Sequence, residues 1–300
     1  MLTPGSLRQR LAERPVLLDG GLATTLELLG HDISGKLWSA RLLIDQPGAI
    51  IEAHTAFFAA GAEVATTASY QATFDGFAAH GIDRGQTADL MRKSVALARE
   101  ASAQVISRPT WVAASVGPYG AMLADGSEYH GRYGLSVGQL REFHRPRIEV
   151  LAAAGADVLA FETLPCAAEV EAVLMEIDEA GLECWVSVSI DGSRTRSGER
   201  LGDVFDMAAD VPGVVALGIN CSAPSDATDA VAVATGAGKP VVVYPNSGEG
   251  WDAVARQWVA THSEPHFPVE RWVAEGARLV GGCCRVTPND ISAMAVQLAQ

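Results

Sequence analysis

The sequence predicts an α/β chain that folds as a single (β/α)8 barrel, a TIM barrel, over residues 1–300. Eight short apolar runs alternate with longer amphipathic stretches, and each run is nearly continuously apolar, as is typical of a strand buried on both faces. The length of 300 residues suits eight strand–helix units. An open doubly wound sheet is the alternative, but no G-x-G-x-x-G motif follows the first run. The eight runs are residues 16–19, 64–70, 111–118, 157–163, 185–190, 214–221, 240–245 and 278–282.

Helical patterns fall between these runs and carry recognisable end signals. Glycine follows three of them, at the position where helices commonly stop. Thr287-Pro288 predicts an N-cap and a first-turn proline for the last helix. Two Gly-rich polar stretches, 120–135 and 191–201, are expected to form long loops on the functional face. The predicted helices are residues 47–60, 136–154, 166–180 and 287–300.

Composition excludes several classes of protein. Hydrophobic residues make up 48% of the chain and charged residues 19%, which argues against disorder. The formal net charge of −14 would repel a phosphate backbone, so we expect no nucleic-acid partner. No apolar run approaches the ~18 residues of a membrane span. Arg8, Arg10 and Arg14 are not followed by an apolar segment, so the start of the chain does not resemble a signal peptide, and a cytoplasmic location is expected.

The predicted functional rim carries three of the five cysteines. Catalytic groups of this fold follow the carboxyl ends of the strands. Cys221 ends the sixth run, and Cys283-Cys284 follow the eighth, where Gly281-Gly282 allow the chain to turn. An odd cysteine count argues against a disulfide framework. The other two, Cys166 and Cys184, are expected to be small buried hydrophobes.

Three thiolates on one rim suit a catalytic zinc site. They bind Zn²⁺ at ~2.3 Å each and leave a fourth position open for a substrate. A substrate thiol at that position is held as the nucleophilic thiolate near neutral pH. The predicted rim contains no histidine, and the chain has no H-E-x-x-H motif, so activation of water is less favoured. Inert packing or a redox role for Cys283-Cys284 remains an alternative.

Three polar residues at strand ends are candidate substrate contacts. Glu162 ends an apolar strand, and burying it unpaired would be costly, so it should meet a cation. That cation is either a substrate ammonium or a structural partner such as Arg285. Asp19 follows the same logic, with capping of the next helix as its alternative. Asn220 either contacts substrate or holds the loop of Cys221.

Five motifs together resemble the homocysteine S-methyltransferase family, from about Val16 to Gln300. The stretches 68–73, 115–132 and 243–249 look most like the S-methylmethionine-using branch, although Thr25 stands where that branch often has an acidic residue. The motifs are Asp19-Gly20-Gly21, Glu162-Thr163-Leu164-Pro165, Gly218-Ile219-Asn220-Cys221, Tyr244-Pro245-Asn246-Ser247-Gly248-Glu249 and Gly281-Gly282-Cys283-Cys284-Arg285.

The resemblance implies a TIM barrel that binds zinc through Cys221, Cys283 and Cys284. It implies that homocysteine lies near Asp19, Glu162 and the backbone of Gly20-Gly21. A sulfonium donor, S-methylmethionine or S-adenosylmethionine, would supply the methyl group, and methionine would be the product. Aromatic faces hold such cations, and the candidates are Tyr70, Tyr119, Tyr244 and Trp38.

Other readings remain open at this point. A betaine donor is possible, whereas a corrinoid or folate donor would need further domains. Selenohomocysteine or another small thiol could replace homocysteine. A zinc-binding or redox-sensing protein without catalysis is the competing class, and a barrel hydrolase with a metal-bound water is a third. A hydrolase would act without a thiol acceptor, and a sensor would be insensitive to loss of Glu162.

Overall fold

The computed structural model describes residues 5–33, 39–252, 257–259 and 267–299, and these contain an eight-stranded parallel sheet. The predicted (β/α)8 barrel is confirmed, and each predicted apolar run overlaps one barrel strand. The strands are β1 (Val16–Leu17), β2 (Val64–Thr66), β3 (Trp111–Val116), β4 (Val158–Leu164), β5 (Cys184–Val188), β8 (Val214–Asn220), β9 (Val241–Tyr244) and β12 (Ala277–Val280).

The sheet closes on itself. Its strand order is β1-β12-β9-β8-β5-β4-β3-β2, and a single parallel bridge between Leu18 and Val64 joins the two ends. At this seam the Glu63 amide donates to the Leu17 carbonyl (2.8 Å), and the Asp19 amide donates to the Val64 carbonyl (3.2 Å). All eight carboxyl ends of the strands therefore meet at one mouth.

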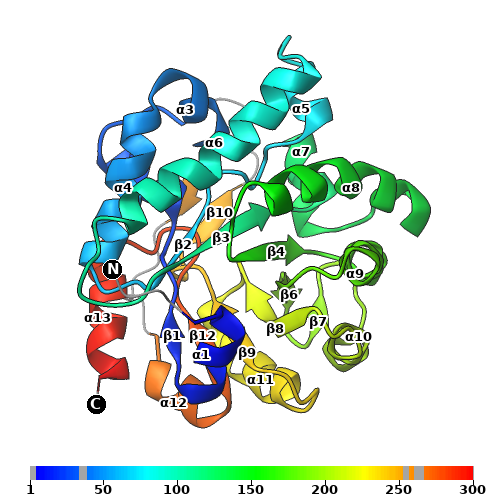
Figure 1. Cartoon of the computed structure of the whole chain (residues 1–300). Helices are drawn as coiled ribbons and strands as arrows, with labels where there is room; N and C mark the ends of the chain where they lie inside the picture. Colours follow the sequence, from blue (N-terminus) through cyan, green and yellow to red (C-terminus); the bar gives the residue numbers. More distant parts are fainter. Residues whose placement is uncertain (1–4, 34–38, 253–256, 260–266, 300) are drawn as a thin grey trace.

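Helices surround the strands (Figure 1). Their ends follow the signals in the sequence: Gly181 ends α9 with φ 62°, and Thr287 forms a capping box with Asp290 at the start of α13. The helices outside the barrel are α2 (Leu22–Leu28), α3 (Ser39–Asp45), α4 (Pro47–Ala59), α5 (Phe74–Ala78), α6 (Arg84–Ser102), α8 (Val137–Ala153), α9 (Ala167–Ala180), α10 (Leu201–Ala209), α11 (Pro224–Thr235), α12 (Val269–Ala274) and α13 (Pro288–Leu298).

A further helix, α1 (Leu7–Glu13), covers the amino-terminal end of the barrel. Its buried Leu7 and Leu11 belong to the same cluster as Val16 and Trp111, the first residues of β1 and β3. The Trp111 indole also donates to the carbonyl of Gly5 (3.0 Å). Because this end is sealed by apolar side chains, the chemistry is confined to the opposite mouth.

The two predicted loops contain short elements. Residues 120–135 include most of α7 (Tyr119–Leu123) and all of the 3-10 turn η1 (Ser127–Tyr129), and the second loop forms the hairpin of β6 (Ile190–Asp191) and β7 (Arg194–Thr195). Another hairpin pairs β10 (Gly250–Asp252) with β11 (Gln257–Val259). Elements of two to five residues are too short to leave a periodic pattern in the sequence.

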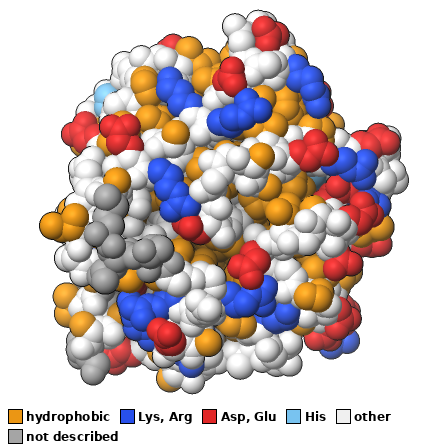
Figure 2. Space-filling view, viewed as in Figure 1, with side chains coloured by type: hydrophobic (Ala, Val, Ile, Leu, Met, Phe, Trp, Pro, Cys, Tyr) orange, Lys and Arg blue, Asp and Glu red, His pale blue; other side chains and the backbone are white. Residues whose placement is uncertain are grey.

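The face seen in Figure 2 carries acidic and basic side chains interspersed rather than one continuous patch of either sign. Such a face offers no basic track for a nucleic-acid backbone. Within the described ranges, every helix is too short or too polar to cross a bilayer.

Candidate active site

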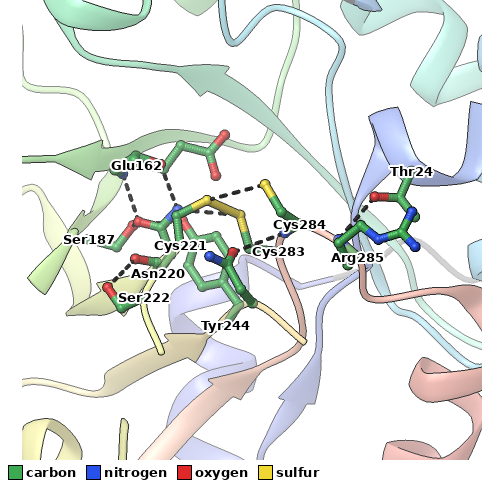
Figure 3. Close-up of a disulfide and its surroundings, with 12 residues drawn as sticks. Thr24, Glu162, Ser187, Asn220, Cys221, Ser222, Tyr244, Cys283, Cys284 and Arg285 are labelled. Carbon is green, nitrogen blue, oxygen red and sulfur yellow. Dashed lines mark hydrogen bonds between the residues drawn. A yellow bond between two sulfur atoms is a disulfide. The ribbon is translucent and has the colours of Figure 1, made fainter. Parts of the chain in front are cut away.

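Cys221, Cys283 and Cys284, here called the sulfur cluster, meet at the mouth of the barrel (Figure 3). Their sulfur atoms all lie within 4.8 Å of one another. Cys221 directly follows β8, and the other two lie in the loop after β12. The structure therefore brings together the three cysteines that the sequence singled out. Cys166 and Cys184 are buried elsewhere as free thiols, as predicted.

Backbone hydrogen bonds fix the two segments that carry the cluster. The Cys221 amide donates to the Tyr244 carbonyl (3.3 Å), and the Cys283 amide donates to the Pro245 carbonyl (2.8 Å). The Cys284 amide donates to the side-chain oxygen of Asn246 (3.2 Å). The segment after β9 thus lies between the two cysteine-bearing segments and sets their spacing, which explains the Tyr-Pro-Asn motif.

The backbone is strained at this site. Four non-glycine residues in the described chain have a positive φ, and three of them are here: Thr163 (62°), Cys221 (46°) and Arg285 (66°). Such conformations cost about 1–3 kcal/mol each and cluster at functional sites. At Cys221 the unusual φ turns the chain at the end of β8, where the thiol joins the cluster.

Gly20 and Gly21 allow the loop after β12 to approach β1. A Cβ on Gly20 would lie 2.6 Å from the carbonyl oxygen of Val286, and one on Gly21 would lie 2.7 Å from that of Cys283. The Gly21 amide already donates to Val286 (2.9 Å). Both glycines line the cavity, and the Gly21 N–H is already bonded within the protein.

The cluster fits one zinc ion with an open fourth position. Two sulfur ligands at ~2.3 Å from a tetrahedral zinc lie about 3.8 Å apart, and the Cys221 and Cys284 sulfur atoms are 3.8 Å apart. In this structure Cys221 and Cys283 are joined by a disulfide, which the odd cysteine count did not lead us to expect. Side chains placed to share one metal are also close enough to bond to each other. The form that binds zinc is therefore the reduced one.

A cavity opens over the sulfur cluster. Gly282 and all three cysteines line it, together with residues at or just after the carboxyl ends of β1, β2, β3, β4 and β9. The side chains used below are Asp19, Thr66, Tyr70, Ser115, Tyr129, Glu162 and Tyr244. The three cysteines and the two buried acids, Asp19 and Glu162, thus line one cavity.

Glu162 is a buried acid that forms no ion pair with any residue in the described ranges. It accepts hydrogen bonds from the hydroxyls of Ser115 and Tyr244. Burial raises its pKa to about 7, and the two hydrogen bonds partly oppose that rise. The alternative partner, Arg285, is excluded: its guanidinium points away from the cluster and pairs with Glu249 at 2.6 Å (Figure 3). Glu162 thus presents an uncompensated acid to the cavity.

Asp19 lies at the seam between β1 and β2. Its carboxylate accepts from the Thr66 amide (2.7 Å) and the Thr66 hydroxyl (2.8 Å). Burial raises its pKa to about 8, the Thr66 hydrogen bonds oppose this, and the charge of Glu162 adds to it. The alternative role as a helix cap is wrong, because Gly21 is the N-cap of α2 and receives no side-chain bond.

Asn220 is enclosed by protein. Its side-chain oxygen accepts from the Thr163 amide (2.7 Å) and the Ser187 hydroxyl (2.9 Å), and its nitrogen donates to the Thr163 hydroxyl (2.8 Å). The residue is fully buried and does not line the cavity. The structure therefore favours the second of the two predicted roles, in which Asn220 holds the strand ends that carry Glu162 and Cys221.

The predicted aromatic residues separate into two groups. Tyr70 and Tyr244 line the cavity, and Tyr70 packs over Gly117, where a Cβ would lie 2.7 Å from its ring. Tyr119 instead packs edge-on against Tyr133 and Phe143 outside the cavity. Trp38 lies outside the described residues.

The residues that line the cavity include several that the sequence analysis did not single out, among them Ser115 and Tyr129. Ser115 donates a hydrogen bond to Glu162 because β3 and β4 are adjacent strands. Tyr129 reaches the cavity from η1. Neither position carries a motif, although both fall in stretches that support the family resemblance. Thr25, which departs from the family pattern, is buried in α2 and does not line the cavity.

Comparison with known proteins agrees with this geometry. The family model described as homocysteine S-methyltransferase matches residues 16–298. The homocysteine S-methyltransferase of Escherichia coli is 48% identical, with 93% of this chain and 94% of that protein covered. Homocysteine S-methyltransferase YbgG of Bacillus subtilis is 42% identical, with 93% of each chain covered.

Solved structures show the same similarity. The crystal structure of the homocysteine methyltransferase MmuM from Escherichia coli in its metallated form has a TM-score of 0.86 and 45% identity over 97% of this chain and 99% of that one. Its oxidised form has a TM-score of 0.87 and 44% identity over 99% and 100%. This chain therefore belongs to the homocysteine S-methyltransferase family and is a methyltransferase.

Proposed function

We propose that the enzyme transfers a methyl group from a sulfonium donor, S-methylmethionine in the first place, to the thiol of homocysteine, giving methionine. The observation that carries the proposal is one cavity lined by three cysteines with zinc-like spacing and by a buried acid, Glu162, that forms no ion pair with the described residues. S-Adenosylmethionine is the alternative donor of the same chemical class.

Each group has a proposed role. Cys221, Cys283 and Cys284 hold the zinc ion. When bound, zinc lowers the pKa of a substrate thiol, so that the thiol reacts as the thiolate. Glu162 binds the ammonium of homocysteine. The hydroxyls of Ser115 and Tyr244 orient the carboxylate of Glu162 toward the cavity. Asp19 is a second buried acid in the wall of the same cavity.

The transfer itself needs no general base among the side chains. The methyl group moves in line between two sulfur atoms, so the protein contributes alignment and a dry cavity. The apolar faces of Tyr70, Tyr129 and Tyr244 bound the space in which the donor would lie. These rings suit a sulfonium, which has no N–H to satisfy and is attracted to aromatic faces.

The first experiment measures methionine formation by reduced protein. The protein is incubated with homocysteine and either S-methylmethionine or S-adenosylmethionine, with and without a zinc chelator. We expect chelator-sensitive methionine formation, faster with S-methylmethionine. No methionine from either donor, in protein shown to contain zinc, would contradict the proposed donor class and make betaine the next donor to test.

A substitution separates catalysis from metal binding. Glu162→Gln should lower kcat/KM by about a hundred- to several thousandfold, because removing one member of a buried charge pair costs about 3–5 kcal/mol. Its zinc content, measured by elemental analysis, should remain that of the wild type. Unchanged turnover would contradict the assignment of Glu162 to substrate binding.

A further inference from the structure

Two of the tyrosine rings that line the cavity, Tyr70 and Tyr129, depend on residues 117–129, here called the mouth segment. Tyr129 belongs to the segment, in η1. The Gly117 amide donates to the Tyr70 carbonyl (3.2 Å), and a Cβ on Gly117 would lie 2.7 Å from the Tyr70 ring. Gly120 is equally close to η1, because a Cβ there would lie 2.6 Å from the carbonyl carbon of Ser127. A displacement of the mouth segment would therefore move both rings.

The mouth segment is held from outside the barrel by Glu169, in the first turn of α9. The helix α7 begins in this segment, and Pro118 at its N-cap provides no side-chain hydrogen bond. The Glu169 carboxylate takes that place, since its Oε1 accepts from the Tyr119 amide at 2.6 Å. An acceptor here satisfies a backbone donor that the start of a helix leaves without a partner. Glu169 thus caps α7 from a different helix.

A neutral histidine joins Glu169 to a buried arginine. His144 Nε2 lies 2.8 Å from Glu169 Oε1, and Arg147 Nη2 lies 2.8 Å from His144 Nδ1. Because a guanidinium can only donate, Nδ1 accepts and Nε2–H donates to Glu169. Arg147 Nη2 also donates to the carbonyl of Gly117. The three side chains, each at most 1% exposed, therefore connect the Gly117 carbonyl to the Tyr119 amide by an unbroken chain of hydrogen bonds.

A second buried carboxylate on α9 shows what the packing of α8 on α9 uses instead. Glu176 pairs with Arg141 (2.6 Å) and with Arg145 (2.8 Å), both of which lie in α8. These ion pairs stay within the two helices, whereas the hydrogen bonds of Glu169 and Arg147 reach the mouth segment. The Glu169 group therefore has a partner that helix packing alone does not require.

We infer that Glu169, His144 and Arg147 are positioning residues for the rings of Tyr70 and Tyr129 and thereby set the affinity for the methyl donor. The inference rests on the proposed function, in which these rings bound the space of the donor. A cation is attracted to a ring face only within about 6 Å of the ring centre, so a small displacement of either ring weakens donor binding. The cysteines follow β8 and β12, so zinc binding does not depend on the mouth segment.

Steady-state kinetics of zinc-loaded protein tests this role. Glu169→Ala removes the acceptor for the Tyr119 amide, whereas Glu169→Gln keeps an acceptor oxygen and loses the charge. Glu169→Ala should raise the KM for S-methylmethionine about three- to thirtyfold, the scale of one cation–π contact, and Glu169→Gln should raise it less. The kcat at saturating donor, the KM for homocysteine and the zinc content should stay within about twofold of the wild type.

Glu176→Gln is the matched control, because it changes a buried carboxylate of the same helix that does not contact the mouth segment. It should leave the KM for S-methylmethionine unchanged. An equal rise in Glu169→Gln and Glu176→Gln would assign the effect to general loosening of α8 and α9 and overturn the inference. A wild-type KM for the donor in Glu169→Ala would overturn it as well.

Two further measurements keep the inference testable. If Glu169→Ala fails to fold, Gly120→Ala displaces η1 without changing any charge and should give the same selective rise in the KM for the donor. Hydrogen exchange of the Tyr119 amide needs no substrate: it should be faster in Glu169→Gln and unchanged in Glu176→Gln, and unchanged exchange in both would contradict the anchoring role. Failure of the wild type to use S-methylmethionine would instead contradict the proposed function.

Discussion

Gly21→Ala tests how closely the metal site depends on the first βα turn. The added Cβ would lie 2.7 Å from the carbonyl oxygen of Cys283, whereas ordinary contact begins at 3.4 Å. The φ of Gly21 is −68°, which alanine adopts freely, so the effect is steric and not conformational. Relief of the contact moves the Cys283 backbone by about 0.7 Å, and zinc sites tolerate about 0.2 Å in ligand distances.

We therefore expect zinc affinity to fall by about ten- to a hundredfold with all three cysteines intact, in the range seen when a group supporting a metal ligand is changed. Competition with a chromophoric chelator measures this affinity. Gly202→Ala in α10, where nothing lies within 4 Å of the new Cβ, is the control and should bind zinc as the wild type does. Wild-type zinc affinity in Gly21→Ala would refute the argument that this glycine positions Cys283.

Three further outcomes are expected. Asn220→Ala should lower the free energy of unfolding by about 1–3 kcal/mol, because two buried donors lose their acceptor; calorimetry will show a lower Tm. Burial lowers the pKa of His54 and His144 to about 4. The stability that depends on burying these two histidines in the neutral form is fully present above the ordinary pKa of 6.5. It is lost as the pH falls toward 4, because the unfolded chain takes up protons first. Urea unfolding at pH 7 and pH 5 should differ by about 2 kcal/mol for each histidine. Cys166→Ala and Cys184→Ala should each retain one zinc per chain by elemental analysis, and loss of zinc would contradict the assigned ligands.

The barrel was predictable because its strands are buried on both faces. Each strand therefore leaves a continuous apolar run, and the cysteines stand out at the ends of two such runs. The helix α1 was also detectable, since Ser6 and Gln9 form a capping box at its start. The sequence analysis did not predict this helix from that signal. The role of α1 in sealing the barrel depends on contacts with β1 and β3 that no local pattern encodes.

The partners of the site residues were not predictable. Glu162 meets Ser115, Asp19 meets Thr66, and Arg285 meets Glu249 because separate strand ends converge. From the sequence, a helix cap for Asp19 and an ion pair between Glu162 and Arg285 stood as alternatives to substrate binding. Short turns could not be predicted either, because an element of three residues such as η1 is too short to show a hydrophobic period. Such a turn nevertheless carries Tyr129 to the cavity.

The closure of the barrel gives Asp19 a second consequence. Between β1 and β2 the structure has one bridge, and the two hydrogen bonds from Thr66 to Asp19 extend that join toward the mouth. The strand pair with the fewest bridges in the barrel is therefore held together by hydrogen bonds to a residue in the wall of the cavity. A ligand that binds the Asp19 carboxylate also changes the two hydrogen bonds that Thr66 donates to it. Ligand binding in the cavity is in this way coupled to the local opening of the barrel between β1 and β2. The hydrogen-exchange rate of the Thr66 amide measures this opening.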